Sequence, residues 1–419
     1  MRVIMLSWEY PPMRVGGIAA ALEGLAPALA RAGVEVHVIT SGASGGALEE
    51  EQAPGLTIHR VQVTEQSDNF IHWVHHLNYH MELRAAALIE RWQAAEEAVP
   101  KQKAGKAAEV SLRPTVLHVH DWLGLFAGRA LKHRYHLPMV STIHATEFGR
   151  NSGIHTEIQR YINQCEWDLQ WESWRVIVCT RFMRAEVEFA LQTPGDKIDI
   201  IYNGVDAGTF DFEFAGEERR EFRAIYAAPD EKIIFFIGRM VREKGAQILI
   251  QALPLVRAGG RSVKLVIAGG GNREHLEQLA YDLGVTEQVF FAGRVSDEDR
   301  DRLYRVADVA VYPSLYEPFG IVALEAMAAR VPVVVSDAGG LPEVVEHDVS
   351  GTVTWNGNPE SLAWGILRAL NDPLSADRMA GNAYVRCVSV FNWDIIARQT
   401  SEVYDRVWSE YEVSAFRPS

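Results

Sequence analysis

Two carboxylates stand eight residues apart in the stretch Tyr316-Glu317-Pro318-Phe319-Gly320-Ile321-Val322-Ala323-Leu324-Glu325. An apolar run over Val309–Tyr312 precedes this stretch and predicts a buried strand. A helix is expected to begin near Pro318 to Gly320, so Glu317 lies just before its N-terminus. Glu325 then lies inside the helix, roughly 8–10 Å further along at a rise of ~1.5 Å per residue.

The helix start between the two acids is a predicted anion site. The amides of Gly320, Ile321 and Val322 would point unpaired from the helix N-terminus, where anions are stabilised. Such a pocket, with a carboxylate on each side, suits a ligand that carries hydroxyl groups at both ends and phosphate in the middle. A nucleotide sugar is a ligand of this kind. The alternative is a solvated helix start with chance acids, because acidic residues are common there.

Two cations are expected at the same edge of the sheet. Gly238-Arg239 and Glu243-Lys244-Gly245 follow a strand predicted over Ile233–Ile237. Arginine and lysine at the carboxyl end of a strand can neutralise a diphosphate and stabilise it as a leaving group. Surface charge at a helix start is the alternative, but the shared edge with Glu317 favours a functional role.

Glycine pairs mark two further loops. Gly16-Gly17 opens a predicted helix and allows the backbone to approach a phosphate closely, although a plain turn explains it equally well. Gly269-Gly270-Gly271 follows a predicted strand and is either a loop that cradles the donor or a simple turn. The chain lacks a full G-x-G-x-x-G pattern at either place.

Histidines and acids near the ends of strands raise the question of a metal. His118 and His120 point to one face of a predicted strand, whereas His144 belongs to another strand, so a metal site is not expected. Asp297-Glu298-Asp299 follows Ser296 and is interpreted as a helix start with Ser296 as its N-cap. The cluster His72, His75 and His76 beside Trp73 is interpreted as an interface or acceptor surface without an assigned role.

Strands alternate with helices along the whole chain, which predicts parallel sheets. Met1–Leu6, a helix from Ile18 and Val34–Thr40 form a Rossmann-type βαβ unit. Residues 65–110 are expected to be helical, with a polar loop near Lys101–Lys106. The remaining strands are predicted at Thr115–His120, Met139–Ile143, Val176–Cys179, Ile198–Tyr202, Ile233–Ile237, Lys264–Ala268, Val289–Phe291, Val309–Tyr312 and Val331–Val335.

This pattern predicts an α/β protein with two Rossmann-like, doubly wound domains that face each other across a cleft. Residues 1–206 are expected to form the N-terminal domain, and residues 207–386 the C-terminal domain with the predicted nucleotide-sugar site. Residues 387–419 are expected to form a C-terminal helix that packs back toward the first domain. Ligands in such sheets bind beyond the carboxyl ends of the strands, which places the site residues of both domains at the cleft.

Bulk properties bound the choice of partners. The chain has 419 residues, a length typical of two domains, and 48% of them are hydrophobic. A net charge of −14 argues against nucleic acid and anionic membranes as partners. The N-terminus is interpreted as a strand, because it lacks the pattern of a signal peptide, and the sequence offers no transmembrane segment. Three scattered cysteines indicate reduced thiols and a cytoplasmic protein.

Taken in order, these motifs resemble the retaining GT-B glycosyltransferases of family 4, and among them the compact, archaeal-type glycogen and starch synthases. The resemblance covers nearly the whole chain. The motifs that carry it are the Gly16-Gly17 loop, His120-Asp121-Trp122, Thr142-Ile143-His144, Asn203-Gly204-Val205-Asp206, Gly238-Arg239 with Glu243-Lys244-Gly245, the Glu317 to Glu325 stretch, and Gly339-Gly340-Leu341-Pro342-Glu343. The longer synthases have Lys-Thr-Gly-Gly where this chain has Arg14-Val15-Gly16-Gly17.

The resemblance implies roles for individual residues. His144, Arg239, Lys244 and Glu317 would be catalytic, with the two cations on the diphosphate and His144 beside the transferred sugar. Asp121 would lie on the acceptor side. The implied donor-binding set is Gly16, Gly17, Arg239, Lys244, Arg294, Glu317, Phe319, Gly320, Ile321, Val322 and Glu325. The leaving phosphate oxygen would take the acceptor proton, so neither a metal nor another cofactor is expected.

The implied reaction is transfer of glucose from ADP- or UDP-glucose to an α-1,4-glucan. A second possibility is another family 4 hexosyltransferase that forms a disaccharide, a glycolipid or another glycoconjugate. A third is a sugar-binding protein on an inactive GT-B scaffold, which the intact Arg239, Lys244, Glu317 and His144 argue against.

Overall fold

The computed structural model describes residues 1–42, 47–63, 69–98 and 113–418. The chain divides into two compact units. The first unit comprises Met1–Cys179, Met183–Tyr202 and Trp393–Ser419, and the second comprises Thr180–Phe182 and Asn203–Asn392. Among the helices of the described ranges, none is both long and apolar enough to cross a membrane.

The first unit is built on an eight-stranded sheet with the order β3-β4-β2-β1-β5-β6-β7-β8. Every pair of neighbours is parallel except β3 and β4, which are antiparallel. Apart from the added β3, this is a Rossmann-like doubly wound order. The strands are β1 (Arg2–Leu6), β2 (Glu35–Ser41), β3 (Glu49–Ala53), β4 (Leu56–Val61), β5 (Thr115–His120), β6 (Met139–Ile143), β7 (Arg175–Val178) and β8 (Ile198–Ile200).

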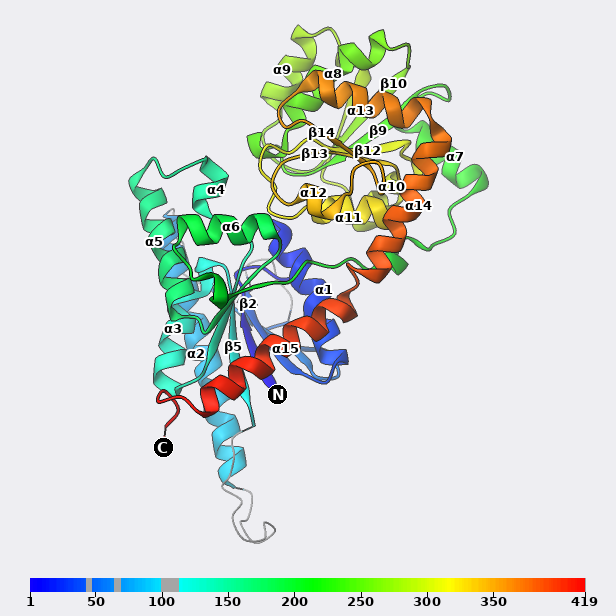
Figure 1. The fold of residues 1–419 in the computed structure, drawn as a ribbon. Helices are drawn as coiled ribbons and strands as arrows, with labels where there is room; N and C mark the ends of the chain where they lie inside the picture. The colour runs from blue at the N-terminus through cyan, green and yellow to red at the C-terminus, as the bar shows by residue number, and fades with distance from the viewer. Residues whose placement is uncertain (43–46, 64–68, 99–112, 419) are drawn as a thin grey trace. The chain divides into compact units, whose positions relative to one another are not determined.

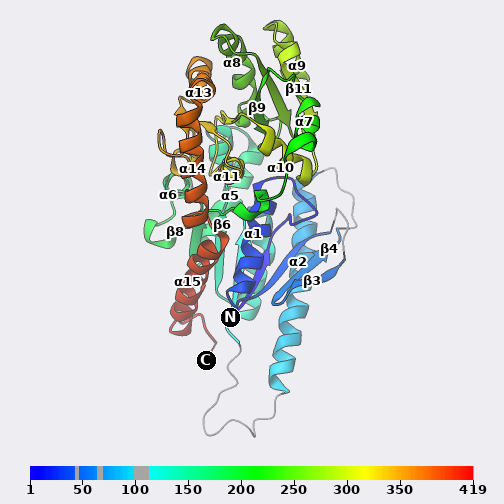
Figure 2. The same cartoon turned by 90° about the vertical axis from the view of Figure 1, so that its right-hand side faces the viewer.

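Helices cover both faces of this sheet (Figure 1). One face carries α1 and α15, which lie side by side in both views (Figures 1 and 2). The opposite face carries α2, α3 and α5. The helices of this part of the chain are α1 (Gly17–Arg31), α2 (Phe70–Glu97), α3 (Leu125–Tyr135), α4 (Glu147–Asn151), α5 (Glu157–Glu172), α6 (Arg181–Ala190) and α15 (Trp393–Glu412), with short 3-10 turns η2 (Trp122–Gly124) and η3 (Gly195–Lys197).

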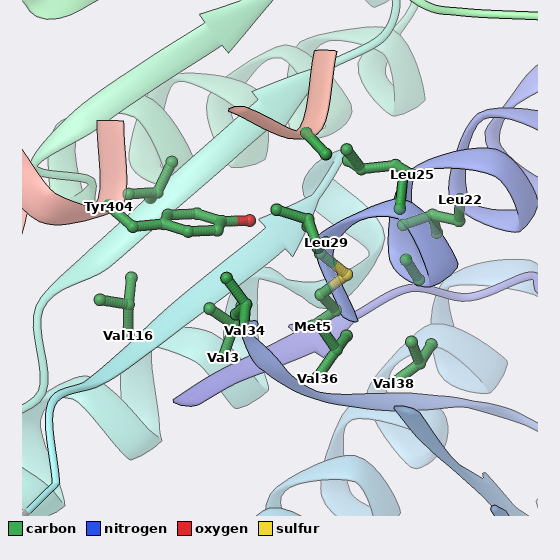
Figure 3. Packing of buried hydrophobic residues seen from close by; sticks show 14 of the residues in the cluster. Val3, Met5, Leu22, Leu25, Leu29, Val34, Val36, Val38, Val116 and Tyr404 are labelled. Carbon is green, nitrogen blue, oxygen red and sulfur yellow. The ribbon is translucent and has the colours of Figure 1, made fainter. Parts of the chain in front are cut away.

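The core of the first unit follows from the spacing of apolar residues. Leu22, Leu25 and Leu29 recur at helical intervals along α1 and point toward the sheet, where they meet alternate residues of the strands (Figure 3). Tyr404 of α15 reaches into the same cluster and is fully buried. Burial of each such side chain contributes ~1.5–3 kcal/mol, so the terminal helix is part of the core of this unit.

The second unit has a six-stranded, entirely parallel sheet with the order β11-β10-β9-β12-β13-β14. The order reverses direction between β9 and β12, and that reversal is where doubly wound sheets bind ligands. The strands are β9 (Lys232–Ile237), β10 (Val263–Ala268), β11 (Val289–Gly293), β12 (Val309–Tyr312), β13 (Val333–Ser336) and β14 (Thr352–Thr354).

Helices cover both faces of this second sheet as well. Helices α8, α9 and α13 lie on one face, and α10, α11 and α14 lie on the other (Figure 1). The helices are α7 (Gly216–Ala224), α8 (Ala246–Ala258), α9 (Glu274–Asp282), α10 (Asp297–Val306), α11 (Ile321–Ala328), α12 (Leu341–Val344), α13 (Pro359–Asn371) and α14 (Pro373–Ser389), with 3-10 turns η4 (Ala207–Phe210), η5 (Arg242–Lys244) and η6 (Thr286–Gln288). The prediction of two doubly wound α/β domains is confirmed.

Sequence reasoning missed three strands. Strand β3 has the sequence Glu-Glu-Glu-Gln-Ala, which has low β propensity and forms only because it pairs at an edge. Strand β4 lacks a clear apolar pattern, because two of its buried residues are His59 and Arg60. Strand β14 is only three residues long. The predicted polar loop near Lys101–Lys106 lies outside the described residues.

The last segment of the chain is shared between the two units. The predicted boundary between residues 386 and 387 falls inside α14, because that helix continues to Ser389 and buries Cys387. Asn392 is the last residue of the second unit, and α15 then belongs to the first unit, where it packs on α1. Backbone bonds of Val205 with Phe391 pair the two connecting segments at their entry to the second unit.

Candidate active site

A lysine and a buried glutamate form the centre of the candidate site in the second unit. Lys244 ends the turn η5 after β9, and Glu317 lies in the loop after β12, the two strands at which the sheet order reverses. Lys244 Nζ lies 2.8 Å from Glu317 Oε2, and Ser314 Oγ donates to the same oxygen at 3.2 Å. Glu317 is only 7% exposed, so its charge is held by these partners.

A glycine allows the two loops to approach each other. Gly245, next to Lys244, has φ +75, and a Cβ there would lie 1.8 Å from the carbonyl oxygen of Pro313. The amide of Leu315 donates to the carbonyl of Glu243 at 2.7 Å, which joins the loops through their backbones. Any side chain at position 245 would force them apart and separate Lys244 from Glu317.

Helix α11 starts directly beside Glu317, as predicted. Gly320 is its N-cap, with φ +107, and as a glycine it has no side chain that could cap the first turn. A Cβ on Gly320 would lie 2.6 Å from Leu341, so the position excludes larger residues. The uncapped first turn, which starts at Ile321 and Val322, leaves its amides available to an anion. The structure therefore brings Lys244, Glu317 and the start of α11 together.

Arg239 and Arg294 lie on loops at the same edge of the sheet. Arg239 Nη2 lies 3.2 Å from Glu243 Oε1, and 43% of the Arg239 side chain is exposed, so its guanidinium can still meet a ligand. Arg294 lies against the glycine turn after β10, since a Cβ on Gly270 would be 2.8 Å from Arg294 Nε. The amide of Met240 donates to the carbonyl of Gly270 at 2.8 Å, which ties the loops after β9 and β10 together.

Glu325 and Phe319 have surroundings that the sequence did not indicate. The Glu325 Oε2 atom accepts from Tyr304 Oη at 2.9 Å, and Arg300 lies 3.9 Å from its other oxygen. Burial raises the pKa of Glu325, and the nearby Arg300 opposes that shift. Phe319 is 3% exposed and packs edge-on against Phe391, which places it in the core of the second unit.

A cavity of about 460 Å³ in the second unit lies away from these residues. It is lined by Lys232, Asp308 and Pro332, which mark the amino ends of β9, β12 and β13. Lys232 Nζ lies 2.9 Å from Asp308 Oδ1, so this cation is already paired. Ligands of doubly wound sheets bind at the opposite edge, where Lys244 and Glu317 lie.

The glycine loop of the first unit is already bound to an acid. Glu9 is fully buried, and its carboxylate accepts from the amides of Val15 at 2.6 Å, Gly16 at 3.0 Å and Ala19 at 3.3 Å. Burial raises the pKa of Glu9, and these three amides oppose the shift. Sequence reasoning missed Glu9, although an acid between apolar and aromatic residues signals a bound carboxylate. The predicted phosphate contact can thus use only the amide of Gly17 unless Glu9 moves.

Asp121 and His144 meet at the carboxyl edge of the first sheet. Asp121 Oδ1 accepts from the backbone amide of His144 at 2.7 Å, and Asp121 is 5% exposed. Asp121 has φ 56 and ψ 171, a conformation that costs a non-glycine residue ~1–3 kcal/mol. Strained residues cluster at functional sites, so the geometry of Asp121 supports a role beyond packing.

His120 and His144 are closer than the sequence suggested. Their separate strands, β5 and β6, are parallel neighbours, and His120 Nδ1 lies 3.1 Å from His144 Nε2. The two rings meet although they come from different strands, because the ends of adjacent parallel strands lie side by side. Across the described ranges, no group of three His, Cys, Asp or Glu side chains has a geometry that could hold a metal ion.

The prediction that Ser296 is the N-cap of α10 is confirmed, because Ser296 Oγ accepts from the amide of Asp299 at 3.0 Å.

Glu166 of α5 is a further buried acid that sequence reasoning left without a role. It is 4% exposed, and its Oε1 accepts from the amide of Glu147 at 2.8 Å. Burial raises its pKa well above the ordinary range, and the neighbouring Asp121 adds to the effect. The signal in the sequence is an acid within the apolar stripe of Cys165 and Leu169.

His75, which the sequence left without a role, lies on the exposed side of α2. Its Nε2 is 3.1 Å from Tyr161 Oη.

Comparison with known proteins agrees with this architecture. The model of Glycosyltransferase Family 4 matches residues 15–208, and the model of Glycosyl transferases group 1 matches residues 218–386. The chain belongs to these glycosyltransferases and has the GT-B fold.

Similar proteins fall within the same class. The chain is 39% identical to an uncharacterized glycosyltransferase of Methanocaldococcus jannaschii, over 96% of this chain and 98% of the relative. It is 35% identical to a glycogen synthase of Mycobacterium tuberculosis, over 96% and 94%. A D-inositol 3-phosphate glycosyltransferase of Pseudarthrobacter chlorophenolicus is 30% identical, over 96% and 94%. The structure of a sucrose-phosphate synthase from Thermosynechococcus elongatus shares the fold, with a TM-score of 0.78 and 23% identity over 98% and 99%.

Proposed function

We propose that this chain is a retaining hexosyltransferase that moves glucose from ADP- or UDP-glucose to an α-1,4-glucan. The observation that carries the donor half is the Lys244–Glu317 pair beside the uncapped start of α11. The acceptor half rests on the 35% identity to a glycogen synthase over nearly the whole chain.

The cations and amides of the second unit suit a departing nucleoside diphosphate. As the bond between the sugar and the phosphate breaks, negative charge grows on the phosphate oxygen. Lys244, the half-exposed Arg239 and the amides of the first turn of α11 are fixed before the reaction, so they stabilise this charge without reorganising. Within the described part of the chain, Glu317 Oε1 has no hydrogen-bond partner and can accept from a sugar hydroxyl.

The proposed step needs neither a metal nor another cofactor. The bond from C1 of glucose to the phosphate oxygen breaks, and a bond from C1 to the acceptor oxygen forms on the same face. The acceptor proton passes to the leaving phosphate oxygen, which becomes a better base as it departs. The configuration at C1 is therefore kept, and no protein side chain has to act as the base.

The acceptor side of the first unit favours an uncharged acceptor. Asp121 accepts from the amide of His144. Burial, and then the charge of Asp121, raises the pKa of the buried Glu9 and Glu166. An acceptor with a phosphate group would be repelled by Asp121, whereas sugar hydroxyls can donate to it. Burial raises the pKa of Glu166 and lowers the pKa of His144. The positive charge of the exposed Arg150 on α4 opposes the first shift and adds to the second.

A second candidate is transfer to a phosphorylated polyol. The 30% identity to a D-inositol 3-phosphate glycosyltransferase supports it, but the carboxyl groups around Asp121 argue against it. The third possibility, a binding protein without turnover, requires that the Lys244–Glu317 pair serves only to hold a sugar nucleotide.

A nucleotide-release assay separates these candidates. The protein is incubated with ADP-, UDP- and GDP-sugars, each with and without glycogen, and in parallel with inositol phosphate. We expect release from ADP- or UDP-glucose that depends on glycogen. Release that ignores glycogen, or no release from any glucose donor, contradicts the proposal. Release that depends on inositol phosphate supports the second candidate, and binding without release supports the third.

A further inference from the structure

Two neighbouring histidines, with rings tilted relative to each other, lie on the face of β5 that α15 covers. His118 and His120 stand on the same face of the strand, and their ring centroids are 4.1 Å apart. Both are buried, at 0% and 1% exposed. His118 is hydrogen-bonded to Tyr404 of α15, and His120 is hydrogen-bonded to His144. None of the steps proposed above uses these two rings.

The direction of the hydrogen bonds at His118 follows from burial. His118 Nδ1 lies 2.6 Å from Tyr404 Oη, and His118 Nε2 lies 2.7 Å from Thr142 Oγ1. If Tyr404 accepted, its own proton would be left in a fully buried place. Tyr404 therefore donates to Nδ1, and Nε2–H of His118 donates to Thr142, which is 7% exposed. Both ring nitrogens of His118 are hydrogen-bonded, and these two bonds fix the orientation of its ring next to His120.

The bond between His120 and His144 contains a single proton. Burial lowers the pKa of both rings, and the neighbouring His118 and His144 lower the pKa of His120 further, so both rings are neutral. Either His120 Nδ1 donates to His144 Nε2, or the reverse. Each choice fixes the tautomer of both rings, because a neutral imidazole has one donor and one acceptor nitrogen.

The unpaired nitrogen of His120 decides between the two arrangements. Within the residues that the structure describes, His120 Nε2 is buried and has no hydrogen-bond partner. If His144 donated, His120 Nε2 would carry an orphaned buried N–H, which is rare in proteins. If His120 donates, the atom left without a partner is a bare ring nitrogen, which has no proton to place. The second arrangement leaves His144 Nδ1 as the N–H that this ring offers to other groups.

We propose that His120 is a positioning residue, whose Nδ1–H donates to Nε2 of His144 and so makes His144 present Nδ1–H to the substrates. The proposal rests on the function proposed above and on the role beside the transferred sugar that the family resemblance implies for His144. A donor at Nδ1 can bind a hydroxyl or ring oxygen of the sugar. The bond from the His144 amide to Asp121 holds the backbone of the same residue, so ring and backbone are both fixed.

Three substitutions of His120 separate positioning from packing. The amide nitrogen of asparagine lies the same number of bonds from Cβ as Nδ1 of histidine, whereas that of glutamine corresponds to Nε2. His120→Asn therefore keeps the donor to His144, and His120→Gln, although nearer to histidine in volume, does not. His120→Phe fills the space without any donor. His275→Phe on the exposed face of α9 serves as the control.

The kinetic result expected is a loss of kcat with little change in KM for the sugar nucleotide. His120→Phe should lower kcat by about 10- to 100-fold, the scale of loss found when the partners that orient metal-binding histidines are removed. His120→Asn should recover most of this loss, His120→Gln should not, and His275→Phe should match the wild type. A His120→Gln variant as active as His120→Asn, or a His120→Phe variant with wild-type kcat, overturns the proposal.

A spectroscopic result tests the tautomer without any turnover. In protein labelled with ¹⁵N-histidine, the His144 signals are assigned by their loss in His144→Asn. The wild type should show a protonated Nδ1 on His144, and His120→Phe should alter that tautomer population. A protonated Nε2 on His144 in the wild type, or an unchanged ratio in the variant, contradicts the inference. If the wild type turns over no sugar nucleotide, the proposed function fails while this measurement still judges the histidine pair.

Discussion

Lys244 and Glu317 form an ion pair, so a ligand that binds one of these side chains must compete with the other. The lysine is 24% exposed in its side chain and the glutamate is buried. A diphosphate would share the lysine, and a sugar hydroxyl would use the free oxygen of the glutamate. At the scale of residues, the proposed donor site is therefore a pre-formed ion pair that suits a ligand with both features.

Removal of Lys244 should abolish most turnover. Lys244→Ala takes away a cation that stabilises the leaving group, and such groups are worth about 10²–10³-fold in kcat. Steady-state kinetics with the preferred sugar nucleotide measures the loss. Lys232→Ala is the matched control, because Lys232 lies at the amino end of β9 and pairs with Asp308. Equal activity of the two variants would refute the role assigned to Lys244.

At the scale of elements, a row of hydrogen bonds joins β2, β3, β4 and α2. The guanidinium of Arg84 binds Glu49 and also donates to His59 Nδ1 at 2.9 Å. Since arginine can only donate, His59 carries its proton on Nε2 and donates to His37 Nδ1 at 3.1 Å. His37 Nε2 in turn donates to Glu35 at 3.2 Å. The row is complete only when both histidines are neutral.

This row predicts a loss of stability in mild acid. Burial and then Arg84 lower the pKa of His59 to about 4, below the value of about 6.5 in the unfolded chain. The unfolded state therefore takes up a proton first, so stability is full above pH ~6.5 and falls as the pH drops toward 4. The loss is on the order of 3 kcal/mol.

Urea unfolding at a series of pH values measures this loss. His59→Gln, which cannot be protonated, should show a flatter dependence between pH 6.5 and 4 than the wild type. Because Glu49, Glu35 and Arg91 also face the pair, the comparison of wild type with variant is the decisive quantity. Parallel curves for the two proteins would show that His59 does not contribute.

The sequence predicted regular elements well and special contacts poorly. Strands such as Val309–Tyr312 are continuous apolar runs, so their positions could be assigned from composition. Strand β3 depends on pairing with β4, which no local pattern encodes. Glu9 and Glu166 escaped notice because a buried acid differs from a surface acid only through tertiary partners.

The donor site illustrates the same limit. Helix starts and glycines placed Gly320 and Lys244 at one sheet edge, because parallel strands end together. The contact of Lys244 with Glu317 itself requires the close approach at Gly245, which only coordinates reveal. Likewise, the burial of Phe319 follows from its packing against Phe391, a residue far along the chain.

At the scale of the whole molecule, the chain crosses from the first unit to the second and returns through α15. The returning helix contributes Ile396, Val403, Tyr404 and Val407 to the core beneath α1. The stability of the first unit therefore depends on the last residues of the chain. A substitution near the C-terminus should act on a domain that begins at the N-terminus.

Tyr404→Ala should destabilise the first unit by ~3–5 kcal/mol, the range found for buried aromatic residues cut to alanine. The change removes a fully buried ring and the partner of His118. Arg398→Ala, on the exposed side of the same helix, should stay within ~0.5 kcal/mol of the wild type. Denaturant unfolding followed by tryptophan fluorescence gives both values. A Tyr404→Ala loss as small as that of Arg398→Ala would mean that α15 is only loosely attached.

The central claim is that glucose passes from a sugar nucleotide to a glucan with its configuration kept. ADP- and UDP-glucose labelled with ¹³C at C1 are incubated with the protein and glycogen, and the polymer is examined by NMR after removal of nucleotide. We predict that the label enters the glucan as α-1,4-linked glucose. A label found in β linkage, or a glucan that stays unlabelled with both donors, would contradict the account.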